Sequence, residues 1–449
     1  MNELFKQKME KLLGAEFNEF VDASSNEISK SFRVNTSKIS NNELLEGLTS
    51  LYGDTNVFDN IPWCPTGYYL TNGDITLGKT PYYHAGAYYI QEASAMIPVE
   101  VLDPKPGELV LDLCAAPGGK SVQIASKLNQ DGFVLSNDIS PKRTKALAKN
   151  LQMAGFRNIA VANASPEQLA DHFPCYFDKV LVDAPCSGEG MFKKDKQAAK
   201  NWTPEYVIEC QSLQRQILIS AVKMLKPGGL LVYSTCTFSP EEDESHIEFL
   251  SNHCPEMSLE KLNAQNGLTS GLNGESVLRA WPHKLKGTGH FIAAYSKSDS
   301  SSTNVKSSVS NSSVAPPETF VDFFGSLPDW LNNGSYCNIK DQLYWLPSGI
   351  NLPRSVRFEL SGLHLGTMKK NRFVPAQALA MALSKNDFRE VISLDISDPL
   401  VLKYLKGETI NLKAPKGWLL ICMNDLPLGW AKSDGNFIKN YYNPNWRMN

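Results

Sequence analysis

Hydrophobic positions between residues 98 and 297 alternate between two spacings. Short apolar runs rich in β-branched residues predict strands, and amphipathic stretches between them predict helices. The predicted strands are Glu108–Leu113, Gly132–Asn137, Ile159–Asn163, Lys179–Asp183 and one beginning at Leu230–Tyr233. The predicted helices are Lys120–Leu128, Pro141–Ala154 and Glu209–Leu225, the last with a stop signal at Pro227-Gly228-Gly229. Near-continuous apolar strands alternating with helices indicate a parallel sheet covered on both faces. We therefore predict a doubly wound α/β domain.

A serine-rich stretch divides the chain. Ten of the eighteen residues from Ser296 to Ser313 are serine. Such polar sequence buries too little apolar surface to offset its ordering entropy, which predicts a flexible linker. We expect a small N-terminal α+β module that binds RNA (1–95), a catalytic domain (96–297), the linker (298–318) and a C-terminal region (319–449). That last region holds fifteen Lys and Arg against eleven Asp and Glu and many aromatic residues, a composition that suits RNA contact.

Overall composition excludes several classes of protein. With 42% hydrophobic and 20% charged residues, the chain is typical of globular proteins rather than disordered or coiled-coil ones. The nine cysteines form no CxxC pair, which argues against a disulfide framework or zinc ribbon and predicts no metal. No window is long and apolar enough for a membrane span, and the N-terminus lacks a signal-peptide core. We therefore expect a cytoplasmic protein.

The first predicted strand leads into a glycine-rich turn, Asp112-Leu-Cys-Ala-Ala-Pro-Gly-Gly-Lys120. Two glycines between a strand and a helix let a ligand approach the backbone. The turn is not a P-loop, because Cys114 occupies the position of the required first glycine. Asp138 ends the second strand, where an acid can accept hydrogen bonds from ribose hydroxyls. The chain thus combines one glycine-rich turn with one acidic residue suited to ribose hydroxyls, and it lacks a P-loop for binding phosphates. This combination suits a nucleoside cofactor such as S-adenosylmethionine.

Two cysteines follow the fourth and fifth strands. Cys186 lies in Asp183-Ala-Pro-Cys-Ser-Gly-Glu-Gly190, and Cys236 lies in Tyr233-Ser-Thr-Cys-Thr-Phe238. Ligands bind outside the carboxyl ends of parallel strands, so neighbouring strands would bring both thiols to one rim beside the cofactor turn. Spacing alone leaves a disulfide or a metal pair open, although no further ligand residue lies nearby in sequence to complete a zinc tetrad.

Together these motifs resemble the RNA (cytosine-5) methyltransferase family. The matching segments are CAAPGGK (114–120), DAPCSGEG (183–190) and STCTFSPEEDE (234–244). An N-terminal RVNT element (33–36) and a GxYYxQExSAM element (86–96) are similar to family elements as well. The C-terminal Tyr404–Glu408, Gly417-Trp418 and Pro427–Lys432 resemble the PUA-like RNA-binding tail of ribosomal small-subunit members of that family.

The resemblance implies a role for each site residue. Cys236 would be the nucleophile that adds to carbon 6 of cytosine, and Cys186 would assist release of the methylated base. Asp183 would hold the ring at nitrogen 3, and Lys120 would help order the cofactor and the thiolate. The implied cofactor is S-adenosylmethionine. Its expected contacts are Cys114, Ala115, Ala116, Pro117, Gly118, Gly119, Lys120, Asp138, Asn163 and Asp183. Asn163 departs from the family, which often has an acid there.

The implied substrate is RNA, with 16S rRNA or the small ribosomal subunit expected and a monomeric enzyme acting on it. Candidate phosphate contacts are Lys142-Arg143, Lys193-Lys194 and Lys369-Lys370-Asn371-Arg372. Three alternatives remain. A tRNA (cytosine-5) methyltransferase would use identical catalytic residues. A non-catalytic ribosome assembly factor is disfavoured by the intact Asp138, Asp183 and cysteines. An amino-group methyltransferase of the DPPY type is disfavoured because Asp183-Ala-Pro-Cys186 lacks its stacking aromatic residue.

Overall fold

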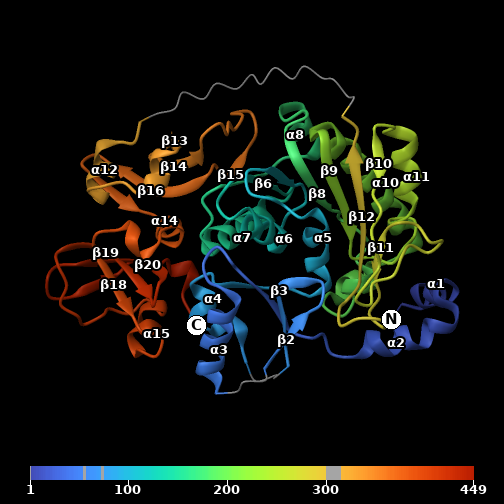
Figure 1. Ribbon diagram of the computed structural model, residues 1–449, viewed down its shortest axis with the longest axis horizontal. Coiled ribbons are helices and arrows are strands. Elements are labelled where there is room, and N and C mark those ends of the chain that lie inside the picture. Colours follow the sequence, from blue (N-terminus) through green and yellow to red (C-terminus); the bar gives the residue numbers. More distant parts are fainter. Residues whose placement is uncertain (1, 54–56, 72–74, 300–314, 449) are drawn as a thin grey trace.

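The computed structural model describes residues 2–53, 57–71, 75–299 and 315–448. Their strands form four sheets, of which the largest has nine strands and occupies the middle of the chain (Figure 1). A four-stranded sheet precedes it in sequence, and two further four-stranded sheets follow it. Most of the predicted linker falls on residues 300–314, which lie outside the described residues.

The central sheet has the strand order β10-β12-β9-β8-β5-β6-β7-β15, with β11 paired to β12. Its parallel strands are β5 (Leu109–Asp112), β6 (Phe133–Asn137), β7 (Ile159–Ala162), β8 (Phe177–Asp183) and β9 (Leu225–Thr235). These match the five predicted strands. Its antiparallel strands are β10 (Met257–Leu259), β11 (Leu278–Ala280), β12 (His290–Lys297) and β15 (Phe358–Leu360). The expected parallel sheet is therefore mixed at both edges.

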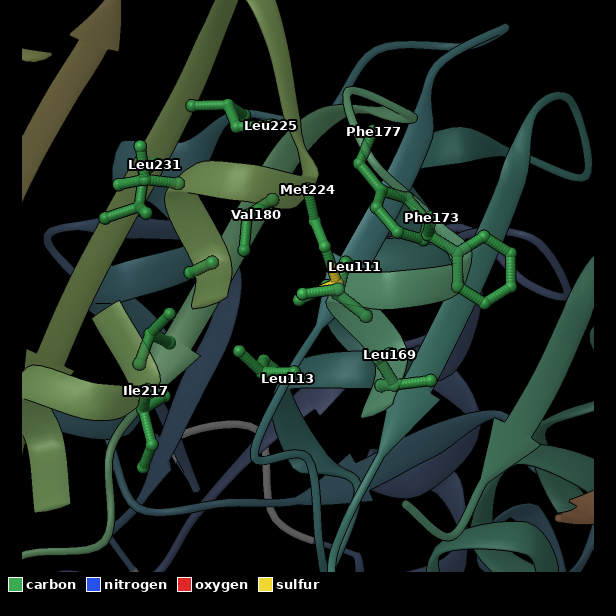
Figure 2. Close-up of a cluster of buried hydrophobic side chains, with 14 of the residues drawn as sticks. Leu111, Leu113, Leu169, Phe173, Phe177, Val180, Ile217, Met224, Leu225 and Leu231 are labelled. Carbon is green, nitrogen blue, oxygen red and sulfur yellow. The ribbon is translucent and has the colours of Figure 1, made fainter. Parts of the chain in front are cut away.

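Helices cover both faces of this sheet, as doubly wound folds require. One face carries α5 (Ile97–Leu102), α6 (Gly119–Leu128) and α7 (Pro141–Ala154), and the other carries α8 (Pro166–His172), α10 (Pro204–Met224) and α11 (Ser245–His253). Adjacent strand residues point to opposite faces, so Val110 packs with α6 and α7 while Leu111 packs toward α8 and α10. Figure 2 shows the second of these clusters, where Leu111 and Val180 lie near Leu169 and Ile217. The predicted α/β class is confirmed.

The helix before Pro227-Gly228-Gly229 ends within one residue of its predicted end at Leu225, but the following strand starts earlier than the predicted Leu230. The helix α10 ends at Met224, and β9 runs through this segment. Leu225 pairs with Phe177, but Leu230 already pairs with Lys179, so the residues between them form a bulge in β9. A bulge accommodates proline and glycine inside a strand because its residues leave the hydrogen-bonding ladder. The helix also starts earlier than predicted, at Pro204, where the Thr203 hydroxyl accepts from the Tyr206 amide.

One edge strand of the central sheet comes from beyond the linker. The strand β15 pairs antiparallel with β7, with Phe358 opposite Ala162. Three residues that precede β15 also belong to the core of the central sheet. Ile350, Leu352 and Val356 pack in the same hydrophobic cluster as Leu111 of β5. The C-terminal region thus contributes a strand directly to the central sheet. Local sequence patterns did not predict this contact between distant segments.

The N-terminal module combines helices with one small sheet. Its sheet has the order β2-β3-β1-β4, with β1 at Ser31–Val34, β2 at Phe58–Ile61, β3 at Cys64–Leu70 and β4 at Tyr88–Ile90. Its helices are α1 (Glu3–Leu13), α2 (Phe17–Ser25), α3 (Asn41–Tyr52) and α4 (Pro81–His84). Figure 1 shows α1 and α2 beside the end of the central sheet near β11. There Phe20 meets Phe238 edge-on at 5.3 Å, just beyond the Cys236 segment.

Two C-terminal sheets complete the structure. The first contains β13 (Gly334–Ile339), β14 (Gln342–Pro347), β16 (Leu363–Lys369) and β17 (Arg372–Pro375). The second contains β18 (Val391–Leu394), β19 (Gly417–Met423), β20 (Leu426–Ser433) and β21 (Ile438–Asn440). The accompanying helices are α12 (Glu318–Phe324), α13 (Asp329–Asn332), α14 (Gln377–Ala382) and α15 (Pro399–Leu405). Tyr404 and Tyr442 pack in one cluster with Tyr82 of the N-terminal module, so both ends of the chain share a core.

Candidate active site

The carboxyl ends of four parallel strands meet at one rim of the central sheet. The strand β5 lies between β6 and β8, and β8 pairs with β9 so that Asp183 stands opposite Ser234. The segments that follow β8 and β9 are therefore neighbours, and the glycine-rich turn after β5 lies beside them. The topology brings the predicted residues of all three segments to the same rim.

The two cysteine sulfur atoms at this rim are 3.4 Å apart. Both side chains are partly exposed, and both thiols are free rather than joined in a disulfide. The hydrogen bond to Cys236 and burial raise the pKa of Cys186 well above its ordinary value. Cys186 therefore stays a neutral thiol, and its S–H can donate to the Cys236 sulfur. A paired thiol and an accessible sulfur are suited to covalent chemistry.

Asp183 lies beside this pair among several donors. The Lys120 ammonium is 2.7 Å from one carboxylate oxygen, and the Ser234 hydroxyl donates to the other at 2.9 Å. His290 Nε2 lies 3.5 Å from that second oxygen. Burial alone would raise the pKa of Asp183, but the charge of Lys120 and the contact with His290 outweigh it and hold the pKa well below its usual range. The carboxylate is therefore an anion that the Lys120 ammonium and the His290 ring can orient.

His290 and its part in this cluster were missed by sequence reasoning. No residue of the segment that carries it was singled out from the sequence as a site residue, and no local signal there points to the rim. The histidine reaches Asp183 because β12 pairs antiparallel with β9, placing Phe291 opposite Thr235. This pairing depends on contacts between segments more than fifty residues apart, which no single-sequence pattern reveals.

The glycine-rich turn is held from behind by the N-terminal module. Gly118 adopts φ +111°, a conformation that disfavours side chains, and a Cβ there would come within 2.9 Å of Leu147. A Cβ at Gly119 would meet Tyr89 and Gln91 at 3.1 to 3.2 Å. The buried guanidinium of Arg33 donates to the Gly119 carbonyl at 3.1 Å. The turn therefore needs bare backbone, and the RVNT element fixes where that backbone lies.

Two further predicted cofactor residues lie at the ends of β6 and β7. One Asp138 oxygen accepts from the Ser140 amide at 2.9 Å, and the other lies 3.1 Å from the Arg143 guanidinium. The Asn163 amide nitrogen donates to the Asp138 and Ile139 carbonyls at 2.9 and 3.0 Å, which leaves its side-chain oxygen as an acceptor. Asn163 thus fixes the backbone around Asp138.

The remaining turn residues are small or uncharged. Ala115 and Ala116 are almost buried, and Cys114 is partly exposed. Burial and nearby carboxylates raise the pKa of Cys114, so it stays a neutral thiol. Pro117 follows Ala116 through a cis peptide bond. The turn offers a ligand backbone and apolar contacts rather than charge.

Beneath the two cysteines lies a buried carboxylate that sequence analysis did not single out. Glu242 accepts from the Ser187 amide at 2.9 Å and from the Gln214 amide at 2.8 Å, and it also accepts from the Ser187 hydroxyl. The Ser187 hydroxyl is in turn 2.8 Å from that of Thr237. Because Ser187 follows Cys186 and Thr237 follows Cys236, this network joins the two cysteine segments.

Glu242 should make stability depend on pH. Burial raises its pKa to about 7 although its hydrogen bonds favour the carboxylate. The folded state therefore binds this proton more tightly than the unfolded state, so the free energy of unfolding falls as pH rises from about 4.5 to 7. Replacing Glu242 with glutamine, which does not ionise, removes this fall in the free energy of unfolding. We expect the variant to gain up to about 3 kcal/mol over the wild type at pH 8 and almost nothing at pH 4.5, measured by urea unfolding.

The matched control for this prediction is Glu241→Gln. Glu241 neighbours Glu242 but lies 2.8 Å from Lys8, and despite burial its pKa is lowered. Its replacement should give no gain at pH 8. Identical pH profiles for Glu242→Gln and the wild type would contradict the assigned protonation of Glu242.

The predicted basic segments do not share one location. Arg143 reaches the cofactor rim through Asp138, whereas the Lys193 ammonium donates to the Ala23 carbonyl at 3.0 Å and so contacts the N-terminal module. Lys369 and Arg372 pair with each other across the β16–β17 hairpin, in a different sheet. Within the described ranges, no group of three or more potential ligand residues could hold a metal ion. No helix there is long and apolar enough to cross a membrane.

Four family models match the chain in succession. Residues 1–93 match the N-terminal domain of 16S rRNA methyltransferase RsmF, and residues 99–296 match 16S rRNA methyltransferase RsmB/F. Residues 321–383 match the RsmF rRNA methyltransferase first C-terminal domain, and residues 391–448 match the methyltransferase RsmF PUA domain. The matches cover the described units on both sides of the linker.

Individual proteins give the same result. Ribosomal RNA small subunit methyltransferase F of Escherichia fergusonii is 33% identical over 445 residues, covering 95% of this chain and 92% of the relative. A methyltransferase homolog protein from Pyrococcus horikoshii is 34% identical, with a TM-score of 0.59 over 66% of this chain and 95% of that one. The structure of NSun6 from the same organism with SFG has the same TM-score over 66% of this chain and 98% of that one. At 23% identity, it shows the shared fold.

Proposed function

This chain belongs to the ribosomal RNA small subunit methyltransferase F family, and from that premise we propose that it methylates carbon 5 of a cytosine in 16S rRNA. It is an S-adenosylmethionine-dependent methyltransferase, as the sequence motifs predicted. The observation that carries the cytosine-5 proposal is the 3.4 Å contact between the Cys186 and Cys236 sulfur atoms beside Asp183. Methylation of a ring carbon needs covalent activation, whereas methylation of an amino group does not, so paired thiols at the reaction rim favour carbon as the target.

Cys236 supplies the activation. Carbon 5 of cytosine is a poor nucleophile until a thiolate adds to carbon 6, which turns the ring into an enamine-like species. The thiolate of Cys236 forms this bond, and carbon 5 then attacks a methyl group. The cofactor, when bound, supplies that methyl on a sulfonium sulfur. The target base must leave any stack to reach the thiol.

Asp183 and Lys120 orient the base. The Asp183 carboxylate faces the ring at nitrogen 3. When the thiolate adds to carbon 6, nitrogen 3 takes up a proton from solvent, and the resulting N–H donates to the carboxylate, which stabilises the adduct. Lys120, 2.7 Å away and only 8% exposed, keeps this carboxylate ionised and fixes its position. Lys120 lies in the first turn of α6, directly after the glycine-rich turn. Its contact with Asp183 connects that turn to the residue that orients the base.

Cys186 removes the last proton. While Cys236 is a free thiol or thiolate, its hydrogen bond and charge raise the pKa of Cys186. Once Cys236 is bound to carbon 6 as a thioether, its charge is gone and it no longer holds the Cys186 proton, while burial and Glu242 still raise the pKa of Cys186. Cys186 then passes its proton to solvent and becomes the base. It then takes the proton from carbon 5, the carbon 5–carbon 6 double bond re-forms, and Cys236 leaves as a thiolate.

The cofactor fits the first three strand ends. Gly118 and Gly119 let the turn pack closely against Leu147, Tyr89 and Gln91. The turn offers a ligand an apolar wall formed by Cys114, Ala115, Ala116 and Pro117. Asp138 provides acceptors for ribose hydroxyls, and the free oxygen of Asn163 can accept from an adenine amino group. Lys120 and Asp183 lie where the cofactor site meets the base site. We assign these residues to cofactor binding.

We also propose where the enzyme acts, its oligomeric state and which of its parts bind RNA. We place it in the cytoplasm, acting as a monomer without a metal. The N-terminal module (1–95) and the C-terminal region (319–449) are proposed as RNA-binding parts that flank the catalytic domain (96–297), with residues 298–318 as linker.

The decisive experiment is methyl transfer from labelled S-adenosylmethionine by the purified protein. Deproteinised 16S rRNA, assembled small subunits and bulk tRNA are offered in parallel and digested to nucleosides. We expect label in 5-methylcytidine from an rRNA sample. Label from tRNA alone would keep the chemistry and contradict the rRNA target. Cofactor binding without any transfer would instead support a non-catalytic assembly factor.

A further inference from the structure

A cavity of about 400 Å³ lies next to the reaction rim, between the N-terminal module and the catalytic domain. Of the catalytic residues among the described part of the chain, neither Asp183 nor the two cysteines line it. Gly190 lines it and donates its backbone N–H to the Cys236 carbonyl at 2.8 Å. A Cβ at Gly190 would approach that carbonyl to 2.9 Å and the Thr288 carbonyl to 2.8 Å. The backbone of Gly190 therefore joins the cavity to the backbone of Cys236.

The cavity walls suit a flat apolar ring. Aromatic side chains from both the N-terminal helices and the catalytic domain line it, namely Phe5, Phe20, Phe192 and Phe238. Phe192 is the most exposed of them, and Phe5 packs edge-on against it at 5.0 Å. Lys193 and Lys286 also line the cavity, and the Lys286 side chain is 62% exposed. Aromatic rings with lysines nearby are typical of sites that stack nucleic-acid bases.

Glu92 adds a fixed acceptor to this cavity. Its Oε1 accepts from the Thr288 amide at 2.9 Å, and its Oε2 accepts from the Ala95 amide at 3.2 Å and from the Ser94 hydroxyl. A carboxylate can accept about four hydrogen bonds, so these three donors orient Glu92 and leave capacity for one more. The other lining carboxylate, Glu189, is nearly buried and already accepts from Trp202 and Phe238.

The charges decide which part of a nucleotide enters. A carboxylate inside the cavity repels phosphate, whereas the exposed ammonium of Lys286 attracts it. The base therefore points inward and the backbone stays outside. A carboxylate accepts hydrogen bonds from the exocyclic amino groups of cytosine, adenine and guanine. Uracil offers only its ring N3–H, which lies between two carbonyl oxygens that the carboxylate repels.

We propose that this cavity binds the base of the nucleotide adjacent to the target cytosine, and that Glu92 selects a base with an amino group there. This inference rests on the proposed function, because the adjacent nucleotide is defined by a cytosine held at Cys236. It assigns a sequence preference to the N-terminal module, which joins the cavity through residues 23–29. The target base occupies the rim, and its neighbour occupies the space across Gly190.

The test uses the full-length enzyme and RNA transcripts that span the methylated cytosine. The nucleotide on each side of the cytosine is changed in turn to each of the four bases. For the wild type, we expect uracil at one of these two positions to lower kcat/KM about tenfold. In Glu92→Gln the same uracil penalty should shrink to roughly threefold or less, since an amide discriminates amino groups poorly. Cofactor affinity and thermal unfolding should not change, which separates selection from a folding defect.

A second variant tests the backbone contact. Lys286→Ala should weaken binding to all transcripts equally and reduce the slope of log affinity against log salt by about 0.7. The matched control is Lys145→Ala, on the exposed side of α7, which should change neither quantity. Equal rates for all bases at both positions in the wild type would overturn the inference, as would equal losses on every transcript in Glu92→Gln.

Binding measured by fluorescence anisotropy decides the inference independently of turnover. If no transcript yields 5-methylcytidine, the proposed function fails. The cavity would still be supported as a base site if wild-type affinity is lower for the uracil transcript and Glu92→Gln abolishes that difference. An unchanged affinity across the transcripts would overturn the inference.

Discussion

Cys236→Ala is expected to abolish 5-methylcytidine formation. The substitution removes the sulfur that would add to carbon 6, and without that bond carbon 5 has too little electron density to attack a methyl group. We expect a loss of about 10⁴-fold or more in kcat, because removing a nucleophile leaves only binding and electrostatic contributions. The measurement is label transfer to the RNA substrate identified for the wild type. Cofactor affinity should stay within about twofold of the wild type, since the expected cofactor residues lie at other strand ends.

The matched control is Cys337→Ala. Cys337 is also a partly exposed free thiol, but it lies on β13 in a C-terminal sheet. Its removal should leave activity unchanged, which separates loss of the nucleophile from loss of any thiol. Residual 5-methylcytidine formation by Cys236→Ala near the wild-type rate would assign the nucleophile to another residue.

Much of this site follows from the sequence because strand ends converge. Each predicted site residue lies within a few positions of the end of a buried apolar strand, and parallel strands end at a common rim. Asp183 and Ser234 face each other in the ladder, so the segments with Cys186 and Cys236 had to be neighbours once β8 and β9 paired. The period of the apolar pattern was enough to locate these strands.

Other parts of the site depend on pairings that no local pattern encodes. His290 reaches Asp183 only through the antiparallel pairing of β12, and Glu242 joins the cysteine segments through Ser187 and Gln214 from separate elements. The edge strand β15 comes from beyond the linker. The predicted start of β9 at Leu230 was wrong for a related reason, because the pairing of β8 with β9 extends the strand back to Leu225 through a bulge.

The N-terminal module is part of the catalytic centre rather than an appendage. Arg33 is 2% exposed and holds the Gly119 carbonyl, so the cofactor turn depends on a strand that lies almost ninety residues earlier. Glu92, only a few residues before the catalytic domain, accepts the Thr288 amide near the end of that domain. The N-terminal module thus positions the glycine-rich turn through Arg33. Through Glu92 it also forms part of the wall of the neighbouring cavity. We therefore expect the RNA binding proposed for this module to be linked to the geometry of the glycine-rich turn.

Cys186→Ala is expected to trap a covalent protein–RNA adduct. In this variant Cys236 still adds to carbon 6 and the methyl group is still transferred. The sulfur that lies 3.4 Å from the Cys236 sulfur in the wild type is missing, so nothing takes the proton from carbon 5. Without that step the double bond cannot re-form and Cys236 cannot leave, so the thioether persists. With cofactor and RNA present, we expect a slow-migrating band on a denaturing gel that protease digestion removes. Turnover should fall at least about a hundredfold, the usual contribution of a positioned general base.

The double variant Cys186→Ala/Cys236→Ala identifies the bond. It should give no adduct, because the trapped species is a thioether to Cys236. Digestion of the single-variant adduct should leave the modified nucleotide on the peptide that carries Cys236. A Cys186→Ala enzyme that turns over without an adduct would show that another group, or solvent, removes the proton from carbon 5. An adduct that survives in the double variant would place the covalent bond on a different residue. The gel therefore separates addition from release, two steps that the loss of activity in Cys236→Ala alone cannot distinguish.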